Sequence, residues 1–502
     1  MINVLERIEF FASKDCDRLV FKSVSGNLSY GQLWESSEVL AARIGALEAE
    51  GILKRGEPIA VYGHKEPEMI VSFIACARMG HPYCPLDRSM PESRIKDILS
   101  EIGTPVMIRC EDGEAKLYCV TESKSHKSTS DMGKQRVFDE DIMYIIFTSG
   151  STGKPKGVEI TRDNLGNFLQ WMTGVATDIN EKEGKVFLNQ APYSFDLSVM
   201  DTYTALASGG TIVSLDKKVL VNPAKTMEFL RSEKPEYWIS TPSFVDMILA
   251  EKDFTQEKFP DIHVFYFCGE RLTKSTAEKL LNAFPDAKVI NTYGPTESTV
   301  AISQVEIRRE HIAGEDELPV GQVKPGTTVL IGMENGDIAT AGEDGKVGEI
   351  FIEGNTVAKG YFRAPEKTDT AFEKISGGRR YHTGDLGYFK GGLLYCIGRT
   401  DLQVKVHGYR MELGDIEANI LSMKEVEAVC VVPKRSDGKI RSLTGFVVAP
   451  TMEGSFGDGK KVKAHLKALL PEYMVPKKIK FIDNMPMTSN GKVDRKKLEE
   501  EA

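Results

Sequence analysis

The chain of 502 residues lacks the features of secreted, membrane-spanning and nucleic-acid-binding proteins. Its first eleven residues carry charges at Glu6, Arg7 and Glu9, where a secretion signal has an apolar core. No apolar run approaches the roughly 18–20 residues that a membrane-spanning helix needs. The formal net charge is −9, so no basic excess indicates binding to nucleic acid or anionic lipid. We therefore expect a cytoplasmic protein.

Cysteine is present but never in a C-x-x-C pair, which argues against a zinc ribbon and against a dithiol redox motif. In a chain of this length, scattered cysteines are typical of a reduced, cytoplasmic enzyme. The eight cysteines stand at positions 16, 76, 84, 110, 119, 268, 396 and 430.

Three common catalytic or nucleotide-binding patterns are missing. The sequence contains neither G-x-G-x-x-G nor G-x-S-x-G, which removes the usual warrant for a dinucleotide site or a serine hydrolase. A Walker A loop is also absent, because Pro155 stands where that pattern requires glycine before its lysine.

The length exceeds what one hydrophobic core usually organises, so we expect at least two domains. Strand-like and helix-like segments alternate through residues 1–320, which predicts parallel sheets flanked by helices, an α/β architecture. The strand-like runs include 186–189, 237–240, 264–267 and 289–291. Short strands with frequent glycine turns predict a β-rich subdomain at about 320–400. Residues 401–502 read as a small α+β domain, so the expected division is 1–400 and 401–502.

A loop rich in glycine, hydroxyls and lysine follows the apolar run Met143–Phe147. Glycines let a backbone approach a ligand closely, and hydroxyls and lysines bind phosphate oxygens. A flexible surface turn is the simpler alternative, but a buried strand leading directly into the loop favours a phosphate site. The loop reads Thr148-Ser-Gly-Ser-Thr-Gly-Lys-Pro-Lys-Gly157.

This loop and the motifs after it resemble the adenylate-forming superfamily, which contains acyl-CoA synthetases, luciferases and amino-acid adenylation enzymes. The resemblance covers almost the whole chain and implies that family's fold, with a large N-terminal domain and a small mobile C-terminal domain. The further motifs are Leu28-Ser-Tyr-Gly-Gln-Leu33, Tyr193-Ser-Phe-Asp196, Asn291-Thr-Tyr-Gly-Pro-Thr-Glu297, Gly348-Glu-Ile-Phe-Ile-Glu-Gly354, Tyr381-His-Thr-Gly-Asp385, the run from Gly398 to Arg410, and Asn490-Gly-Lys-Val-Asp-Arg495.

The resemblance implies an ATP site and a magnesium ion. Tyr293 would stack on the base, Asp385 would bind the ribose hydroxyls, and Glu297 would help to hold Mg²⁺, which prefers oxygen ligands. Lys492 would place its ammonium between the acyl oxygen and the α-phosphate, as catalytic residue. By composition alone each of these residues has a simpler structural role. The implied ATP-binding residues are Thr148, Ser149, Gly150, Ser151, Thr152, Gly153, Lys154, Asn291, Thr292, Tyr293, Gly294, Pro295, Thr296, Asp385, Arg399 and Lys492.

A lysine near the end of the chain that serves a site in the large domain implies that the small domain moves. By resemblance, Asp401 is the hinge, and Lys405 to Met411 form a loop that enters the site after adenylation. Hinges lie at the ends of elements that absorb a backbone rotation.

Asp196 bears on the identity of the substrate acid. Asp is common as a helix N-cap, and spacing leaves this role and a binding role open. By resemblance, amino-acid-activating members carry Asp here to pair with the substrate's α-ammonium. The implied substrate pocket contains Asp196, Leu197, Met200, Cys268, Thr292, Val300 and Ala301, with Lys492 at its reacting end. Besides Asp196 and Lys492, no charged residue stands in this set to bind a polar side chain, and Met200 is bulky. The implied pocket therefore favours a substrate with a small apolar side chain.

Cys268 and the stand-alone length resemble the branch of the family that activates D-alanine and charges a phosphopantetheine carrier protein for teichoic acid D-alanylation. Cys268 could also be only a buried strand-end residue. The last motif lies at the end of the chain, so we expect the carrier to be a separate protein. Two alternatives stay open: activation of another small acid, with transfer to a carrier or to coenzyme A, and a nucleotide-binding sensor that has lost catalysis.

Overall fold

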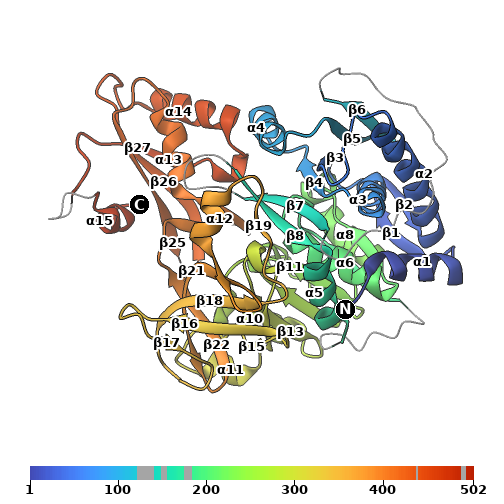
Figure 1. Cartoon of the computed structure of the whole chain (residues 1–502). Helices are drawn as coiled ribbons and strands as arrows, with labels where there is room; N and C mark the ends of the chain where they lie inside the picture. The colour runs from blue at the N-terminus through green and yellow to red at the C-terminus, as the bar shows by residue number, and fades with distance from the viewer. Residues whose placement is uncertain (121–140, 149–154, 175–183, 407, 437–438, 488–492) are drawn as a thin grey trace.

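The computed structural model describes residues 1–120, 141–148, 155–174, 184–406, 408–436, 439–487 and 493–502 (Figure 1). Ser149–Lys154 and Lys492, which were predicted to contact ATP, lie outside these ranges. The main helices are α1 (Val4–Lys14), α2 (Tyr30–Ala49), α3 (Pro67–Met79), α4 (Glu92–Ile102), α5 (Arg162–Gly174), α6 (Leu197–Ser208), α8 (Pro223–Glu233), α9 (Pro242–Ile248), α10 (Lys274–Ala283), α12 (Pro365–Ala371), α13 (Leu413–Leu421), α14 (Phe456–Leu469) and α15 (Arg495–Glu500), with short α7 (Lys217–Leu220) and α11 (Arg309–Ala313).

The first sheet has a parallel centre with antiparallel edges, in the order β15-β14-β13-β12-β11-β9-β10-β1-β2. Its central strands are short apolar runs whose residues are almost all buried, as in sheets covered on both faces. The strands are β1 (Leu19–Ser23), β2 (Gly26–Ser29), β9 (Val186–Asn189), β10 (Thr211–Ser214), β11 (Tyr237–Ser240), β12 (Val264–Phe267), β13 (Lys288–Tyr293), β14 (Ser303–Glu306) and β15 (Gln322–Val323).

The second sheet has the order β19-β8-β7-β4-β3-β5-β6. Helix α3 contacts strands of both sheets, and α5 on the second sheet packs against α6 on the first. These helices therefore form a layer shared by the two sheets, and one large hydrophobic core joins them. The strands are β3 (Ile59–Gly63), β4 (Tyr83–Asp87), β5 (Val106–Glu111), β6 (Glu114–Cys119), β7 (Ile142–Thr148), β8 (Lys156–Thr161) and β19 (Gly360–Tyr361).

The third sheet is antiparallel and begins at Thr327, in the region for which the sequence predicts a β-rich subdomain. One strand of this region, β19, leaves it and pairs with β8 of the second sheet. The strands are β16 (Thr327–Gly332), β17 (Ile338–Ala339), β18 (Gly348–Gly354), β20 (Phe372–Ile375), β21 (Gly378–Lys390) and β22 (Leu393–Arg399).

The C-terminal segment has its own hydrophobic core, built from α13, α14 and the sheet β25-β26-β27. A hairpin of β23 and β24 connects it to the larger body, and α14 lies beside α4 of that body (Figure 1). Among the residues that the structure describes, none of the helices has the length and apolar character that crossing a bilayer requires. The strands are β23 (Gln403–Val406), β24 (Tyr409–Glu412), β25 (Ala428–Ser436), β26 (Lys439–Val448) and β27 (Lys478–Phe481).

Candidate active site

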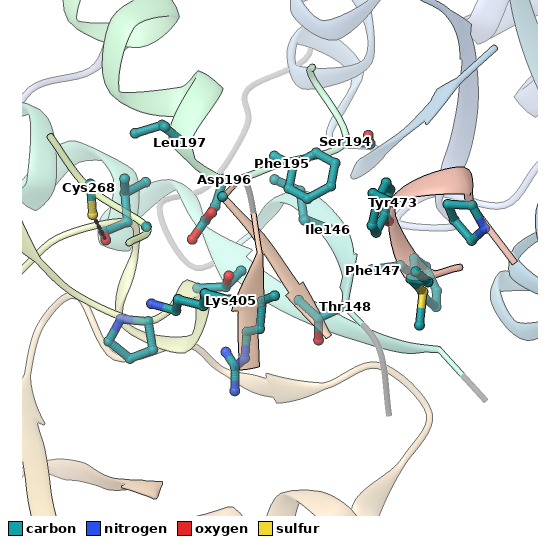
Figure 2. Close-up of a pocket in the computed structure, with 18 of the residues that line it drawn as sticks. Ile146, Phe147, Thr148, Ser194, Phe195, Asp196, Leu197, Cys268, Lys405 and Tyr473 are labelled. Atoms are coloured by element: carbon teal, nitrogen blue, oxygen red, sulfur yellow. Dashed lines mark hydrogen bonds between the residues drawn. The ribbon is translucent and has the colours of Figure 1, made fainter. Parts of the chain in front are cut away.

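Asp196 stands at the start of α6 and lines a cavity together with Ser194, Leu197 and Cys268 (Figure 2). Its backbone is already helical, and its carboxylate makes no capping bond to any described residue. Burial raises the pKa of Asp196, while a hydrogen bond with Thr296 and the positive charge of Lys405 act in the opposite direction. The geometry therefore favours the binding role over the capping role that the sequence left open.

The apolar lining of this cavity includes Leu197, Cys268 and Val300. The Cys268 thiol donates a hydrogen bond to the Val300 carbonyl oxygen at 3.5 Å, which Figure 2 shows as a dashed line. Burial raises the pKa of Cys268, so its sulfur is a neutral thiol and acts as a wall. Met200 and Ala301 were predicted to line the pocket. They are instead fully buried in the main hydrophobic core and are not among the residues that line this cavity.

The end of β13 places a second group of predicted residues on an adjoining cavity. Asn291, Thr292, Tyr293 and Gly294 line it, and Asp385 and Arg399 from the third sheet face them across it. The amide of Asn291 donates to the Pro319 carbonyl oxygen at 2.8 Å, and the Thr292 hydroxyl donates to that of Phe267 at 2.8 Å. These two hydrogen bonds attach the end of β13 to the neighbouring chain segments at Pro319 and Phe267.

Asp385 connects the two sides of this second cavity. The Tyr293 hydroxyl donates to Asp385 Oδ2 at 2.6 Å, and the Arg399 guanidinium binds Oδ1 of the same carboxylate. Gly294 lies so close to the turn at Val300 that a Cβ there would lie 2.5 Å from the Cα of Ala301. Only glycine fits at this position, which explains on steric grounds why the motif has glycine at 294.

Hydroxyl groups without partners mark the first cavity as a polar ligand site. Among the described side chains, the buried Oγ1 of Thr148 and Oγ of Ser194 have no hydrogen-bond partner, and both residues line the cavity. Pro295 and Thr296 line it as well. Thr148 ends β7 directly before the glycine-rich loop, and its register partner on β8 is Lys156. An unsatisfied buried hydroxyl costs free energy that a ligand oxygen would recover.

Glu297, the predicted metal ligand, is fully buried and engaged on both carboxylate oxygens. Arg410 Nη1 lies 2.6 Å from Oε2, while the Tyr361 hydroxyl donates to Oε1 at 2.8 Å and Lys156 Nζ lies 3.4 Å from it. Burial alone would raise the pKa of Glu297, but the charges of Arg410 and Lys156 hold it well below its usual range.

This carboxylate suits Mg²⁺ chemically, because a permanently ionised oxygen donor is what a hard cation prefers. Within the described residues, no group of three or more acidic, histidine or cysteine side chains could hold a metal ion. Glu297 alone would therefore share the ion with nucleotide phosphate oxygens and water, and Arg410 would have to withdraw. No motif in the sequence predicted that the hydroxyl of Tyr361 would contact this carboxylate.

The hairpin of β23 and β24 enters the site, as the resemblance implied for Lys405 to Met411. Lys405, Gly408 and Arg410 all line the first cavity, and Figure 2 shows the Lys405 strand below Asp196. The Gly408 N–H donates to Glu270 Oε1 at 2.7 Å, with φ at 83°. A Cβ at Gly408 would lie 2.3 Å from the Thr241 methyl, so the hairpin's close approach requires glycine here.

Comparisons with known proteins agree with this geometry. Residues 8–362 match the AMP-binding enzyme family, and residues 415–492 match the AMP-binding enzyme C-terminal domain. The chain is 42% identical to a D-alanine--D-alanyl carrier protein ligase of Bacillus velezensis, over 100% of this chain and 99% of the relative. It is 41% identical to the enzyme of the same name from Bacillus licheniformis, with the same coverage.

Solved structures share the fold. The Vibrio cholerae adenylation domain AlmE, in complex with glycyl-adenosine-5'-phosphate, superimposes with a TM-score of 0.83 at 22% identity and covers 99% of this chain and 96% of its own. The o-succinylbenzoate CoA synthetase of Bacillus subtilis has a TM-score of 0.82 at 19% identity, over 100% of this chain and 98% of its own. With both family matches in sequence order and relatives matched end to end, the chain belongs to the AMP-binding enzyme family and is an AMP-forming ligase that uses ATP and Mg²⁺.

Proposed function

We propose that this enzyme activates D-alanine as D-alanyl-AMP and transfers the alanyl group to the phosphopantetheine thiol of a separate carrier protein, for D-alanylation of teichoic acids. The observation that carries the proposal is the carboxylate of Asp196 in the lining of the first cavity, to which Leu197, Cys268 and Val300 contribute apolar side chains. A buried ammonium needs a partner of opposite charge, and Asp196 supplies one. The names of the curated relatives point to the same substrate and partner.

In the first half-reaction, an oxygen of the substrate carboxylate forms a bond to the α-phosphorus of ATP. The bond from that phosphorus to the bridging oxygen breaks, and pyrophosphate leaves. Asp196 holds the α-ammonium, while Leu197, Cys268 and Val300 limit the size of the side chain. Positioning and charge neutralisation supply most of the acceleration in such a transfer.

We assign the remaining predicted residues to the same step. The glycine-rich loop after Thr148 would bind the β- and γ-phosphates, Asp385 the ribose hydroxyls, and Lys492 the two reacting oxygens. Mg²⁺, when bound, offsets the negative charge of the phosphates, and Glu297 is its protein ligand. Tyr293 and Arg399 fix Asp385 through the contacts described above.

In the second half-reaction, the carrier thiol releases its proton to water and its sulfur bonds to the alanyl carbonyl carbon. The bond from that carbon to the phosphate oxygen breaks, and AMP leaves with its electrons. The hairpin bearing Lys405 and Gly408 forms part of the cavity in which this exchange takes place. Asp401 is the hinge about which residues 401–502 would turn between the two steps. Since ATP and carrier proteins are found there, we place the reaction in the cytoplasm.

The deciding experiment is amino-acid-dependent ATP–pyrophosphate exchange with D- and L-alanine, glycine and D- and L-serine. We expect the highest kcat/KM with D-alanine and some activity with glycine and D-serine, because one methylene or hydroxyl changes binding by only about 1–3 kcal/mol. A higher kcat/KM with another acid would identify that acid as the substrate in place of D-alanine. The absence of exchange with every acid would favour the alternative of a nucleotide-binding sensor without catalytic activity.

The acceptor is tested separately. Purified carrier protein with its phosphopantetheine arm should gain the mass of one alanyl group in the presence of D-alanine, ATP and Mg²⁺. Coenzyme A is the competing acceptor, and faster alanylation of coenzyme A than of the carrier would contradict the proposal.

A further inference from the structure

The turn that follows the short 3-10 helix η1 (Thr296–Ser298) has an unusual backbone conformation. Thr299 and Val300 have φ angles of 60° and 69°, in the left-handed region that β-branched residues rarely adopt. Among the described residues, they are the only two neighbouring non-glycine residues with a positive φ. Both are buried. A conformation of this kind persists only where the surrounding structure holds it, so the contacts of this turn decide its shape.

Hydrogen bonds to backbone oxygens hold the turn. The Ala301 N–H donates to the Thr299 carbonyl oxygen at 2.8 Å. The Ile302 N–H donates to the Tyr293 carbonyl oxygen at 2.7 Å. A third bond runs from the Thr299 hydroxyl to the Thr356 carbonyl oxygen, also at 2.7 Å. Of these three bonds it alone depends on a side chain, so a substitution can remove it and leave the other two.

The acceptor of that bond has a fixed position of its own. Thr356 lies two residues after β18, the motif Gly348–Gly354, to which the proposed function assigns no role. The amide of Asn164, in the first turn of α5, donates to the Asn355 carbonyl oxygen at 2.8 Å and to that of Val357 at 3.1 Å. The backbone on both sides of the Thr356 carbonyl is therefore tied to the second sheet and its helices.

The conformation of the turn reaches the substrate site through Val300. This residue lines the first cavity, and its carbonyl oxygen accepts the bond from the Cys268 thiol (Figure 2). The end of β13 packs tightly on the same atoms, since a Cβ at Gly294 would lie 2.7 Å from the Val300 carbonyl oxygen. A return of Val300 to a negative φ would turn its side chain and its carbonyl away from these positions. The apolar lining at Val300 thus depends on the left-handed conformation.

We infer that Thr299 is a positioning residue that sets the selectivity for the substrate side chain. Its bond to Thr356 holds Val300 in the left-handed conformation, and Val300 then limits the size of that side chain. Thr299 is not among the described residues that line either cavity, so it acts through Val300. The inference rests on the proposed function, because it concerns the lining that faces the amino acid. It also gives the motif Gly348–Gly354 a role, since β18 leads directly to the Thr356 carbonyl.

The test compares Thr299→Val, which keeps the β-branched shape without the hydroxyl, with Thr299→Ser, which keeps the hydroxyl. Pyrophosphate exchange gives kcat/KM for D-alanine and for D-2-aminobutyrate, which is one methylene longer. In Thr299→Val we expect kcat/KM for D-alanine to fall roughly 5–10-fold, the range that one neutral hydrogen bond supports. Its ratio to that for D-2-aminobutyrate should fall about threefold or more, part of what one methylene is worth in a fitted pocket.

The loss should appear in the KM for the amino acid and not in the KM for ATP. Glu297 keeps its contacts with Arg410, Tyr361 and Lys156 in Thr299→Val, since none of them involves the hydroxyl that is removed. Thr299→Ser should stay close to the unmodified enzyme in both constants. An equal rise of the two KM values would indicate a general loss of structure and contradict the inference.

Thr226→Val is the matched control. Thr226 is buried in α8, and its hydroxyl donates to the Val219 carbonyl oxygen at 3.0 Å. It is not among the described residues that line the two cavities. Like Thr299→Val, this variant loses one buried bond from a threonine hydroxyl to a carbonyl oxygen. It should lower the stability of the protein and leave the ratio between the two amino acids unchanged.

A double-mutant cycle with Val300→Ala tests whether Thr299 acts through Val300. Val300→Ala alone should lower the ratio, because it removes part of the lining. Adding Thr299→Val to it should then change the ratio little, since residues that act as one unit are not additive. Full additivity, an unchanged ratio in Thr299→Val alone, or an equal loss in Thr299→Ser would overturn the inference.

If Thr299→Val does not fold, Asn164→Ala tests the same link from its other side. It releases the carbonyl oxygens of Asn355 and Val357 and should lower the ratio in the same direction. An unchanged ratio in a folded Asn164→Ala would count against the inference. A failure of the proposed substrate would be visible in the unmodified enzyme as a preference for another acid. The preferred acid and its homologue with one more methylene would then replace the two probes, so Thr299 would still be judged separately.

Discussion

Both carboxylate oxygens of Asp401 accept hydrogen bonds from Arg399, each at 2.7 Å. The same guanidinium binds Asp385, which lines the second cavity, so the proposed hinge and the proposed ribose site share one arginine. The Asp401 carboxylate also accepts from the Gln403 N–H at 3.1 Å, which fixes the first residue of β23. A rotation at Asp401 would therefore change both the entry of the hairpin and the setting of Arg399.

The hinge is tested by Asp401→Pro, because proline fixes φ and removes a backbone degree of freedom. We expect one half-reaction to be impaired at least tenfold more than the other, as measured by pyrophosphate exchange and by transfer from supplied alanyl-adenylate. Asp401→Ala removes the same carboxylate without restricting φ, and it should lower the two rates by similar factors. If Asp401→Pro lowered the rates of both half-reactions by the same factor, the assignment of Asp401 as the hinge would be wrong.

Lys492→Ala tests the assignment of the catalytic lysine. Without the ammonium, charge on the reacting oxygens is not offset, and removal of such a group costs roughly 10²–10³-fold in rate. We expect pyrophosphate exchange to fall by at least that factor, while thiol transfer from supplied adenylate is retained. Lys496→Ala removes an exposed lysine of the same tail and should behave like the unmodified enzyme. Unchanged exchange in Lys492→Ala would contradict the role.

Asp196 predicts a pH dependence of substrate binding. Since burial raises its pKa, the carboxyl becomes neutral at a pH above its usual range, and the neutral form cannot pair with an ammonium. The KM for D-alanine should therefore rise as pH falls through the raised pKa, and recover as pH increases. Asp196→Asn should have a high KM that does not follow this trend. Glu92→Gln, which changes an exposed carboxylate, should keep the unmodified profile.

Much of the fold was predictable because buried parallel strands are short apolar runs between helices. The expected strands at 186–189, 237–240 and 264–267 are confirmed at those bounds. The predicted strand at 289–291 is correct but too short, since β13 continues to Tyr293. Its last residues pair with Gln304 and Ser303 of β14, an antiparallel partner that local sequence does not reveal.

The sequence motifs predicted which residues belong to the candidate site, but they did not predict which of these residues contact one another. Resemblance located Asp196, Cys268 and Asp385, and the structure brings all three to the edges of two adjoining cavities. The partners of Glu297 could not be foreseen, because Tyr361 is 64 residues away from it along the chain and Arg410 is 113. Such pairings depend on how separate sheets and the C-terminal segment meet, which no periodicity within one segment encodes.

Asp415 gives the interface between the two parts a pH-dependent stability. Its side chain is fully buried near Arg94, and burial raises its pKa from 3.8 to about 6. The folded state binds the proton more tightly than the unfolded state, so stability that is present below about pH 4 is lost as pH rises to about 6. The difference between these two pKa values corresponds to no more than ~3 kcal/mol in the free energy of unfolding.

Asp415→Asn cannot titrate and should remove this loss. Its Oδ1 can still accept the hydrogen bond that Asn419 donates at 3.0 Å. Between pH 4.5 and 7, we expect the urea midpoint of the unmodified protein to fall relative to that of the variant. Asp253→Asn, which alters an exposed carboxylate, should follow the unmodified protein at every pH. Parallel curves for the unmodified protein and Asp415→Asn would show that Asp415 is ionised throughout.

Lys65 is not among the residues that line the first cavity, but it contacts residues shortly before Asp196 in the chain. It is fully buried after β3, donates to the Ala191 carbonyl oxygen at 2.5 Å and to Asn189 Oδ1, and lies 4.5 Å from the centre of the Tyr193 ring. Asn189 in turn donates to Asp201 Oδ1 at 2.6 Å. Burial lowers the pKa of Lys65 and raises that of Asp201, so each charge depends on the other for its stability.

Lys65→Met should leave the buried Asp201 carboxylate uncompensated, at a cost of about 3–5 kcal/mol in the free energy of unfolding. It should also raise the KM for D-alanine, because the turn from Ala191 to Asp196 loses the anchor on its first carbonyl. Lys96→Met, at an exposed position, should stay within about 0.5 kcal/mol of the unmodified protein. Double substitution with Asp201→Asn discriminates further: if the cost arises from the unpaired charge, the second change recovers stability while KM stays high. A double variant less stable than Lys65→Met would show that packing around Tyr193 dominates instead of charge.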